Sequence, residues 1–170
     1  LGQEGVDAIA AATPLARMAA GESTPTLLQM FLGVKSSCAM GEVSAAALLL
    51  GGFYLVIRKV IKPITPLVFV GTVFLLSGAL GMDPVAQILS GGLMLGAIFM
   101  ATDYATTPAT GWGKAVFGLG CGIITVLIRK YGSYPEGVSF AILLMNILTP
   151  QIDKAFLHKP LGGKKVAKNA

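Results

Sequence analysis

The sequence has few charged residues: Asp, Glu, Lys and Arg make up 12% of its 170 residues, while 54% are hydrophobic. Soluble proteins are about one quarter charged. A small soluble domain has more water-facing than buried positions, so this chain could not cover a soluble surface. A disordered chain is also excluded, because such chains are poor in hydrophobic residues. The composition therefore predicts an integral membrane protein.

Residues that carry much of soluble-enzyme chemistry are scarce as well. His158 is the only histidine, which excludes His-based triads and multi-histidine metal sites within this chain, so no metal site is expected. No P-loop or glycine-rich dinucleotide fingerprint occurs. The two cysteines, Cys38 and Cys121, are too few and too far apart for a disulfide framework. Any redox chemistry must therefore use a cofactor.

Long uncharged runs, by contrast, are abundant. A transmembrane helix needs roughly 20 apolar residues, with about 17 as a lower bound. Five runs cover residues 43–57, 63–82, 84–102, 115–128 and 137–152. The second and third reach that length outright, the first reaches it if Arg58 and Lys59 snorkel, and the last two are marginal. We therefore expect an all-α membrane protein with a bundle of about five transmembrane helices.

This pattern divides the chain into three parts. We expect an extramembrane segment at 1–41, a five-helix transmembrane domain at 42–153 and a basic tail at 154–170. With five spans, one side of the membrane receives most of the 13 basic residues. Basic residues accumulate on the cytoplasmic face, so we expect the tail to be cytoplasmic and the segment 1–41 to be outside. The basic residues on the outer side are Arg17, Lys35, Arg129 and Lys130.

The net charge of +5 follows from this distribution. The basic residues are not interleaved with aromatic residues on a polar face, as they are in many nucleic-acid-binding proteins. We therefore expect the lipid bilayer as a partner, and no nucleic acid.

A few polar residues lie at or near membrane depth, where polarity is costly and often functional. As candidates for an ion path we take five of them: Asp103, Thr106, Thr107, Glu136 and Asn146. Each also has a structural interpretation. The segment 103–108 could form a capping turn, Glu136 could favour a helix dipole, and Asn146 could make an interhelical hydrogen bond.

Three glycines alternate in the fourth run, at Gly118, Gly120 and Gly122. Small residues at a spacing of four let helices approach closely. The spacing predicts close helix packing, with close approach of the backbone to a cofactor as the alternative. Cys121, within this stretch, is expected to pack rather than to bind a metal.

Several motifs together resemble one known family. Residues 101–108 read ATDYATTP and resemble the ATD-x-x-T-x-P motif of the D subunit of the Rnf electron-transport complex. The stretch 128–137 (IRKYGSYPEG), with FAILLMN and TPQID downstream of it, is similar to the same family, and GEVSA at 41–45 is similar to its GETSA element. These motifs cover nearly the whole chain in the family's order. A sister family is the B subunit of the sodium-pumping NADH:quinone oxidoreductase.

The resemblance implies a multi-pass subunit of an ion-translocating complex in the bacterial inner (plasma) membrane. Such complexes exchange electrons between ferredoxin and NAD, so the partners would be other membrane and flavin-bearing subunits. Family members have about ten membrane helices in two five-helix repeats. This chain would match the second repeat and the outer segment before it, and we expect the amino-terminal half to be missing.

The resemblance also implies a covalent flavin mononucleotide (FMN). The family joins FMN through its phosphate to a threonine in an S/T-G-A-T sequence. Here residues 10–13 read AAAT, and Thr13 would carry the phosphoester. A riboflavin is a further cofactor that the family resemblance allows. The charge distribution places residues 1–41 outside, in agreement with the family's outward-facing FMN.

Two classes of function follow. The first is an electron-transfer subunit that couples a flavin to sodium or proton translocation and is inactive as an isolated chain. The second is a passive transporter or channel half without a redox cofactor, because interrupted helices also surround transport sites. A structural assembly subunit is a third possibility. Covalently bound flavin is expected for the first class only, so its detection would distinguish that class from the other two.

Overall fold

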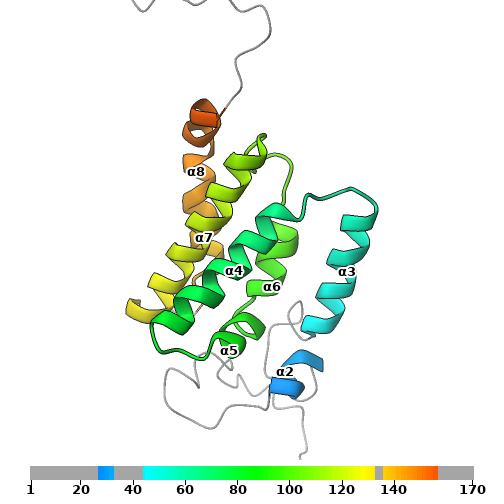
Figure 1. Cartoon of the computed structure of the whole chain (residues 1–170), viewed down its shortest axis with the longest axis vertical. Coiled ribbons are helices and arrows are strands. Elements are labelled where there is room, and N and C mark those ends of the chain that lie inside the picture. The colour runs from blue at the N-terminus through cyan, green and yellow to red at the C-terminus, as the bar shows by residue number, and fades with distance from the viewer. Residues whose placement is uncertain (1–26, 33–43, 133–135, 157–170) are drawn as a thin grey trace, which may run out of the picture.

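The computed structural model describes residues 27–32, 44–132 and 136–156, and every regular element in these residues is a helix (Figure 1). The predicted all-α class is thus confirmed for the described part of the chain. One helix, α7 (Gly111–Tyr131), is long and apolar enough to cross a membrane by length and composition. The count of five spanning helices stays a prediction.

One uninterrupted helix forms at each of four of the five uncharged runs. These helices are α3 (Ala45–Ile57), α4 (Ile64–Ala79), α7 and α8 (Val138–Phe156), and a short helix, α2 (Leu27–Leu32), precedes them. In Figure 1 the four longer helices run lengthwise and successive segments alternate in direction. The helix α7 extends beyond both ends of the run 115–128 that predicted it.

The third run, 84–102, which is long enough for a spanning helix, is interrupted in the structure. It forms α5 (Pro84–Leu89), then α6 (Leu93–Leu95) and the π-helical turn η2 (Gly96–Met100). The break comes at Gly91 and Gly92, which both have a φ of +65°. Such backbone angles are readily adopted by glycine and end a right-handed helix.

Local sequence signals fix where the helices begin. The carboxylate of Asp83 accepts hydrogen bonds from the amides of Val85 and Ala86 at 3.1 and 3.4 Å, and Thr110 caps α7 in the same way. Pro63 precedes the first residue of α4, a position where a missing amide hydrogen costs little. Pro63 and Pro66 therefore both lie at the start of this helix.

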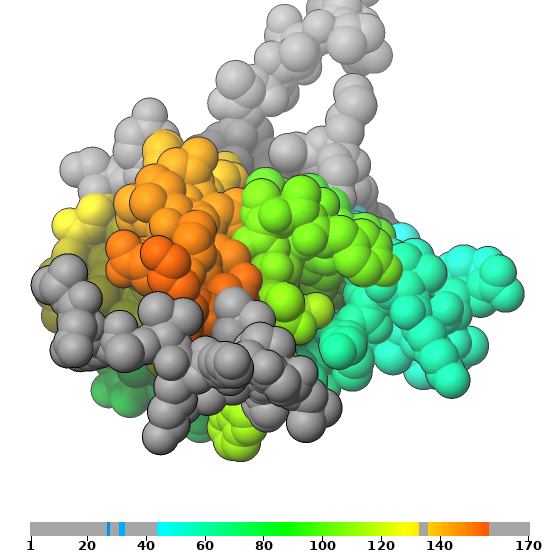
Figure 2. Space-filling view, turned by 90° about the horizontal axis from the view of Figure 1, so that it is seen from above, coloured from blue at the N-terminus to red at the C-terminus, as the bar shows by residue number. Residues whose placement is uncertain are grey.

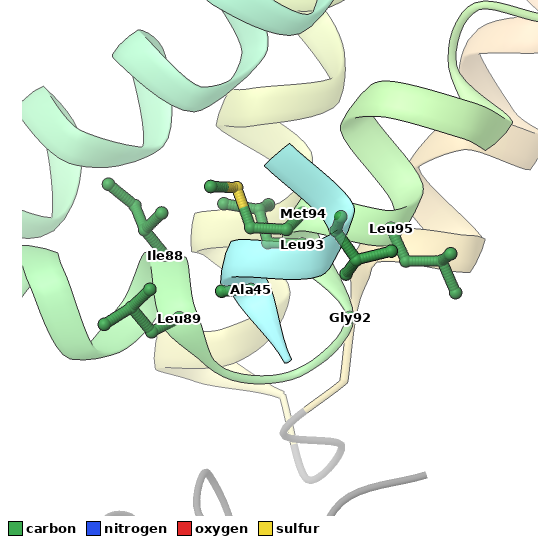
Figure 3. A pocket seen from close by; sticks show the side chains of 8 residues that line it. Ala45, Ile88, Leu89, Gly92, Leu93, Met94 and Leu95 are labelled. Atoms are coloured by element: carbon green, nitrogen blue, oxygen red, sulfur yellow. The ribbon is translucent and has the colours of Figure 1, made fainter. Parts of the chain in front are cut away.

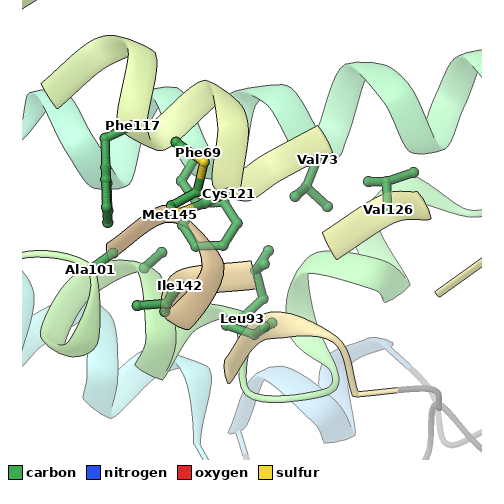
Figure 4. Packing of buried hydrophobic residues seen from close by; sticks show 11 residues of the cluster. Phe69, Val73, Leu93, Ala101, Phe117, Cys121, Val126, Ile142 and Met145 are labelled. Carbon is green, nitrogen blue, oxygen red and sulfur yellow. The ribbon is translucent and has the colours of Figure 1, made fainter. Parts of the chain in front are cut away.

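The core lies where α4, α7 and α8 meet. A Cβ atom on Gly118 would lie 2.8 Å from the backbone oxygen of Thr65, and one on Gly122 would lie 2.6 Å from Cβ of Thr72. These two glycines thus let α7 approach the backbone of α4, which confirms close helix packing. Cys121 is fully buried beside Phe69, Phe117 and Met145 (Figure 4), so it serves packing as predicted.

The outer surface of the helices is strongly apolar. Leu50 and Leu75 are each 71% exposed, and Leu67 is 69% exposed. Seen from above, α3 projects from the block that contains α7 and α8 (Figure 2). Large exposed apolar surfaces mark sites of contact with lipid or with other proteins.

Candidate functional site

The two ends of the bundle differ in their basic residues. The lysine end, where α4 and α7 begin and α8 ends, carries Arg58, Lys59, Lys62, Lys114 and Lys154. The arginine end, where α4 and α7 end, carries Arg129 and Lys130. A hydrogen bond from Tyr104 to the carbonyl of Val60, and one of 3.0 Å from the amide of Ala109 to Asp153, join the loops of the lysine end.

Arg129 holds the break in the third segment at the arginine end. Its guanidinium donates hydrogen bonds to the backbone oxygens of Gln87 (2.6 Å), Ser90 (3.1 Å) and Gly91 (3.2 Å). It also donates to the side chain of Gln87 at 3.1 Å. The last carbonyls of a helix lack intrahelical donors and carry partial negative charge. A fixed guanidinium therefore stabilises the end of α5 and the unwound residues after it.

Lys130 plays a similar part for α4. Its ammonium lies 3.1 Å from the backbone oxygen of Leu80, the residue that ends this helix. Both basic residues at the arginine end are thus bound to helix carboxyl ends. These contacts explain why two basic residues lie at the end of the bundle that has few of them.

Sequence reasoning noted Arg129 only as an exception to the charge distribution and missed its contacts. The sequence did contain a hint of these contacts. A pair of basic residues on the less basic side of a membrane protein is expected to have a local partner. A serine and two glycines at 90–92 marked the segment whose carbonyls could supply one.

The space beside the break is small. Figure 3 shows Ala45 of α3 facing the segment that contains Gly92, Leu93 and Met94. The cavity there has a volume of about 10 Å³, room for about one water molecule. The contacts between α3 and this segment are therefore ordinary packing between helices.

Three ion-path candidates lie together at the lysine end. The Thr106 hydroxyl donates to the Asp103 carboxylate at 3.2 Å. The Thr107 hydroxyl donates to the backbone oxygens of Asp103 (2.5 Å) and Ala101 (3.2 Å). They form one turn that follows η2, as the capping interpretation of this segment expects. The Asp103 side chain is exposed there.

The other two candidates lie away from this turn. Glu136 is exposed just before α8, at the arginine end. Asn146 lies within α8, and its Oδ1 atom is buried with no hydrogen-bond partner among the described residues. The five residues therefore do not form a single site. Asn146 has an unsatisfied acceptor, which the described contacts leave without a structural explanation.

Other sequence predictions lie outside the described residues, among them Thr13, Cys38 and His158. In the described ranges there is no cluster of three or more His, Cys, Asp or Glu residues that could hold a metal ion.

The interrupted segment and the apolar exterior are features of membrane transport proteins. A family model described as the NQR2, RnfD, RnfE family matches residues 3–162. The chain therefore belongs to this family, and the relationship predicted from its motifs is confirmed.

Individual relatives show which branch of this family the chain resembles. The chain is 45% identical over 168 residues to the D subunit of the Na(+)-translocating ferredoxin:NAD(+) oxidoreductase complex of Acetobacterium woodii, and the match covers 96% of the chain and 52% of that protein. It is 43% identical over 171 residues to the D subunit of the proton-translocating ferredoxin:NAD(+) oxidoreductase complex of Clostridium ljungdahlii (91% and 51% covered).

A third relative, the D subunit of the ion-translocating oxidoreductase complex of Stutzerimonas stutzeri, is 41% identical over 145 residues (80% and 40% covered). The chain spans about half the length of the first two relatives.

Proposed function

We propose that the chain acts within a membrane subunit of an ion-translocating electron-transport complex of the ferredoxin:NAD type. In this proposal it carries FMN on Thr13 and couples electron transfer to sodium or proton translocation. The names of its relatives support the general role. Since the chain spans about half of those proteins, it would act with further protein segments and with other subunits of a bacterial inner-membrane complex, and would be inactive alone.

The family match over residues 3–162 carries this proposal, and the interrupted third segment supports its ion-path part. Half-helices whose ends meet inside a bundle are typical of ion and substrate paths, because they expose backbone groups at membrane depth. Here α5 ends at residues whose carbonyls bind Arg129, and η2 continues to the Asp103 turn. In a continuous helix these carbonyls would accept intrahelical hydrogen bonds instead.

The charge distribution supports the proposed orientation. Lysines gather at the lysine end, whereas the two basic residues at the arginine end bind helix carbonyls. Of the described basic residues, those without a helix carbonyl as partner are thus concentrated at one end, as the cytoplasmic side of a membrane protein requires. In this orientation the segment 1–41 is outside.

Flavin attachment would use Thr13. The residues before it, Ala10, Ala11 and Ala12, are small, so a flavin transferase would have access to the hydroxyl. Bound FMN supplies one- and two-electron chemistry that no side chain of this chain offers. A noncovalent riboflavin is a second cofactor that the family relationship suggests.

Coupling requires that the redox state of a centre change the affinity or access of an ion site. Asn146 would offer its unpaired Oδ1 to a passing cation, because an amide oxygen is a hard ligand. The Asp103 carboxylate, with Thr106 and Thr107 beside it, would receive or release the ion at the lysine end. Glu136 would serve at the arginine end.

Flavin fluorescence in a denaturing gel tests the proposal. The chain is produced in a host that has the flavin transferase, then denatured so that only covalent flavin stays with it. We expect a fluorescent band that Thr13→Val abolishes. Thr24→Val is the matched control, since Thr24 also precedes a proline in the same segment, and it should keep the band.

A passive transporter or channel half is the alternative function, because the interrupted segment suits it equally well. A dark band from the unmodified chain would contradict covalent flavin and favour this alternative or a structural assembly role. Fluorescence that persists in Thr13→Val would move the attachment to another residue.

A further inference from the structure

A basic cavity lies at the lysine end, between the loop that joins α3 to α4 and the start of α7. Its volume is about 130 Å³. Lys59, Lys62 and Lys114 line it, together with hydroxyl groups of Thr65, Thr102 and Tyr104. Three lysines from two separate parts of the chain therefore line one small space.

The carboxylates at this end of the bundle accept hydrogen bonds from other groups. Asp103 accepts a hydrogen bond from Thr106, and Asp153 accepts one from the amide of Ala109. No ion pair links Lys59, Lys62 or Lys114 to an acid in the described ranges. Three like charges around one cavity repel one another, so an anion bound between them would stabilise the arrangement.

Hydrogen bonds fix the walls of this cavity. The hydroxyls of Tyr104 and Thr102 donate to the backbone oxygens of Val60 and Ile98. These two hydroxyl protons are committed to the protein itself, so the charged donors available to a ligand are the lysines. The site thus suits a negative group with several acceptor oxygens, such as a phosphate.

An apolar groove adjoins the basic cavity. It has a volume of about 340 Å³, runs between α3 and α4, and is lined by Phe53, Val56, Leu67 and Val70 among other apolar residues. Ile61 lines both the groove and the basic cavity. A charged cavity therefore opens beside an apolar groove of the kind that an acyl chain fills.

We propose that this composite site binds an anionic phospholipid. Its phosphate lies among Lys59, Lys62 and Lys114, and one acyl chain lies along the groove between α3 and α4. Basic cavities between helices on the cytoplasmic side of membrane proteins suit anionic headgroups, and the lysine end is the proposed cytoplasmic end. The juxtaposition of charge and apolar groove selects a lipid over a soluble anion.

Lipid titration of the complete chain tests this proposal. The delipidated protein in mild detergent is titrated with phosphatidylglycerol, and with phosphatidylcholine of the same acyl chains, and binding is followed by native mass spectrometry. Glycerol 3-phosphate serves as the soluble anion. We expect phosphatidylglycerol to bind at least tenfold more tightly than either other compound.

Two matched pairs of variants locate the site. Lys62→Gln should weaken phosphatidylglycerol binding roughly fivefold, whereas Lys154→Gln, at the same end but outside the cavity, should leave it unchanged. Leu67→Trp fills the groove and should weaken binding at least fivefold. Leu75→Trp, equally exposed on the same helix but outside the groove, should not.

Circular dichroism of each variant confirms that its helices are intact, and Lys62→Arg, which keeps the charge, should retain binding. The proposal is overturned if phosphatidylglycerol does not bind, if phosphatidylcholine binds as well, or if Lys154→Gln weakens binding as much as Lys62→Gln. Tight binding of glycerol 3-phosphate that Leu67→Trp leaves unchanged would indicate a soluble-anion site and also overturn it. None of these results depends on flavin at Thr13, so this test and that of the proposed function fail separately.

Discussion

The Nη1 atom of Arg129 donates two hydrogen bonds to Gln87, one to its backbone oxygen at 2.6 Å and one to its side-chain Oε1 at 3.1 Å. Gln87 lies in α5, 42 residues earlier in the chain, and is buried. This contact ties the end of α7 to the half-helix before the break. It positions the interrupted segment, on which the proposed ion path depends.

Replacing Arg129 with methionine should destabilise the bundle. The variant loses four hydrogen bonds to α5 and the break and leaves buried carbonyls unpaired, which should cost about 2–4 kcal/mol. Unfolding in mild detergent, followed by circular dichroism, measures this loss. Lys130→Met removes a single exposed contact and should cost less than about 1 kcal/mol. Equal effects of the two variants would contradict a special role for Arg129.

The glycines of α7 and α4 offer a matched pair. A Cβ on Gly118 would lie 2.8 Å from the Thr65 backbone oxygen, whereas one on Gly71 would meet nothing within 4 Å. Gly118→Ala should therefore cost about 1–3 kcal/mol, because the helices must separate. Gly71→Ala should stabilise the protein by about 0.5–1 kcal/mol, because alanine favours helix. The same unfolding assay measures both changes in stability. If Gly118→Ala leaves the stability unchanged, the close α4–α7 contact is refuted.

Replacing Asn146 with leucine should raise stability but lower ion transport. Its buried Oδ1 has no partner among the described residues, so removal of the amide should raise stability by about 1 kcal/mol. If Asn146 contacts the ion, cation uptake into membrane vesicles that contain the assembled complex should fall at least tenfold. Thr149→Val is the control, since its hydroxyl is bonded to Met145 in the same helix at 3.1 Å. Unchanged uptake in Asn146→Leu would remove this residue from the path.

Asp103→Asn tests the turn at the lysine end. The variant keeps the shape of the side chain and its hydrogen bond with Thr106 but removes the negative charge. Vesicle uptake should fall at least tenfold while the unfolding curve stays in place. Asp83→Asn keeps a good helix cap at the start of α5 and should transport normally. If both variants behave alike, the Asp103 charge has no special role in transport.

The sequence allowed local features to be predicted well. Gly118 and Gly122 act across one pair of helices, so their spacing was informative. The break at Gly91 and Gly92 was not predicted, because uncharged composition alone does not distinguish one helix from two half-helices. The contact of Arg129 with Gln87 joins distant parts of the chain, and a single sequence does not show which carbonyls a guanidinium will reach.

Of the candidate site, the sequence identified residues but not their arrangement. Asp103, Thr106 and Thr107 are close in sequence and form one turn. Glu136 and Asn146 were grouped with them by polarity alone, and the fold separates them. The basic cavity needed the fold as well, because Lys114 lies far along the chain from Lys59 and Lys62.

If this chain carries covalent FMN, the mass of one peptide will show it. Trypsin should cleave after Arg17, and the peptide that ends there contains Thr13. After production with the flavin transferase, we predict a peptide heavier by FMN less one water, with fragmentation that places the addition on Thr13. An unmodified peptide from the same host would contradict covalent FMN.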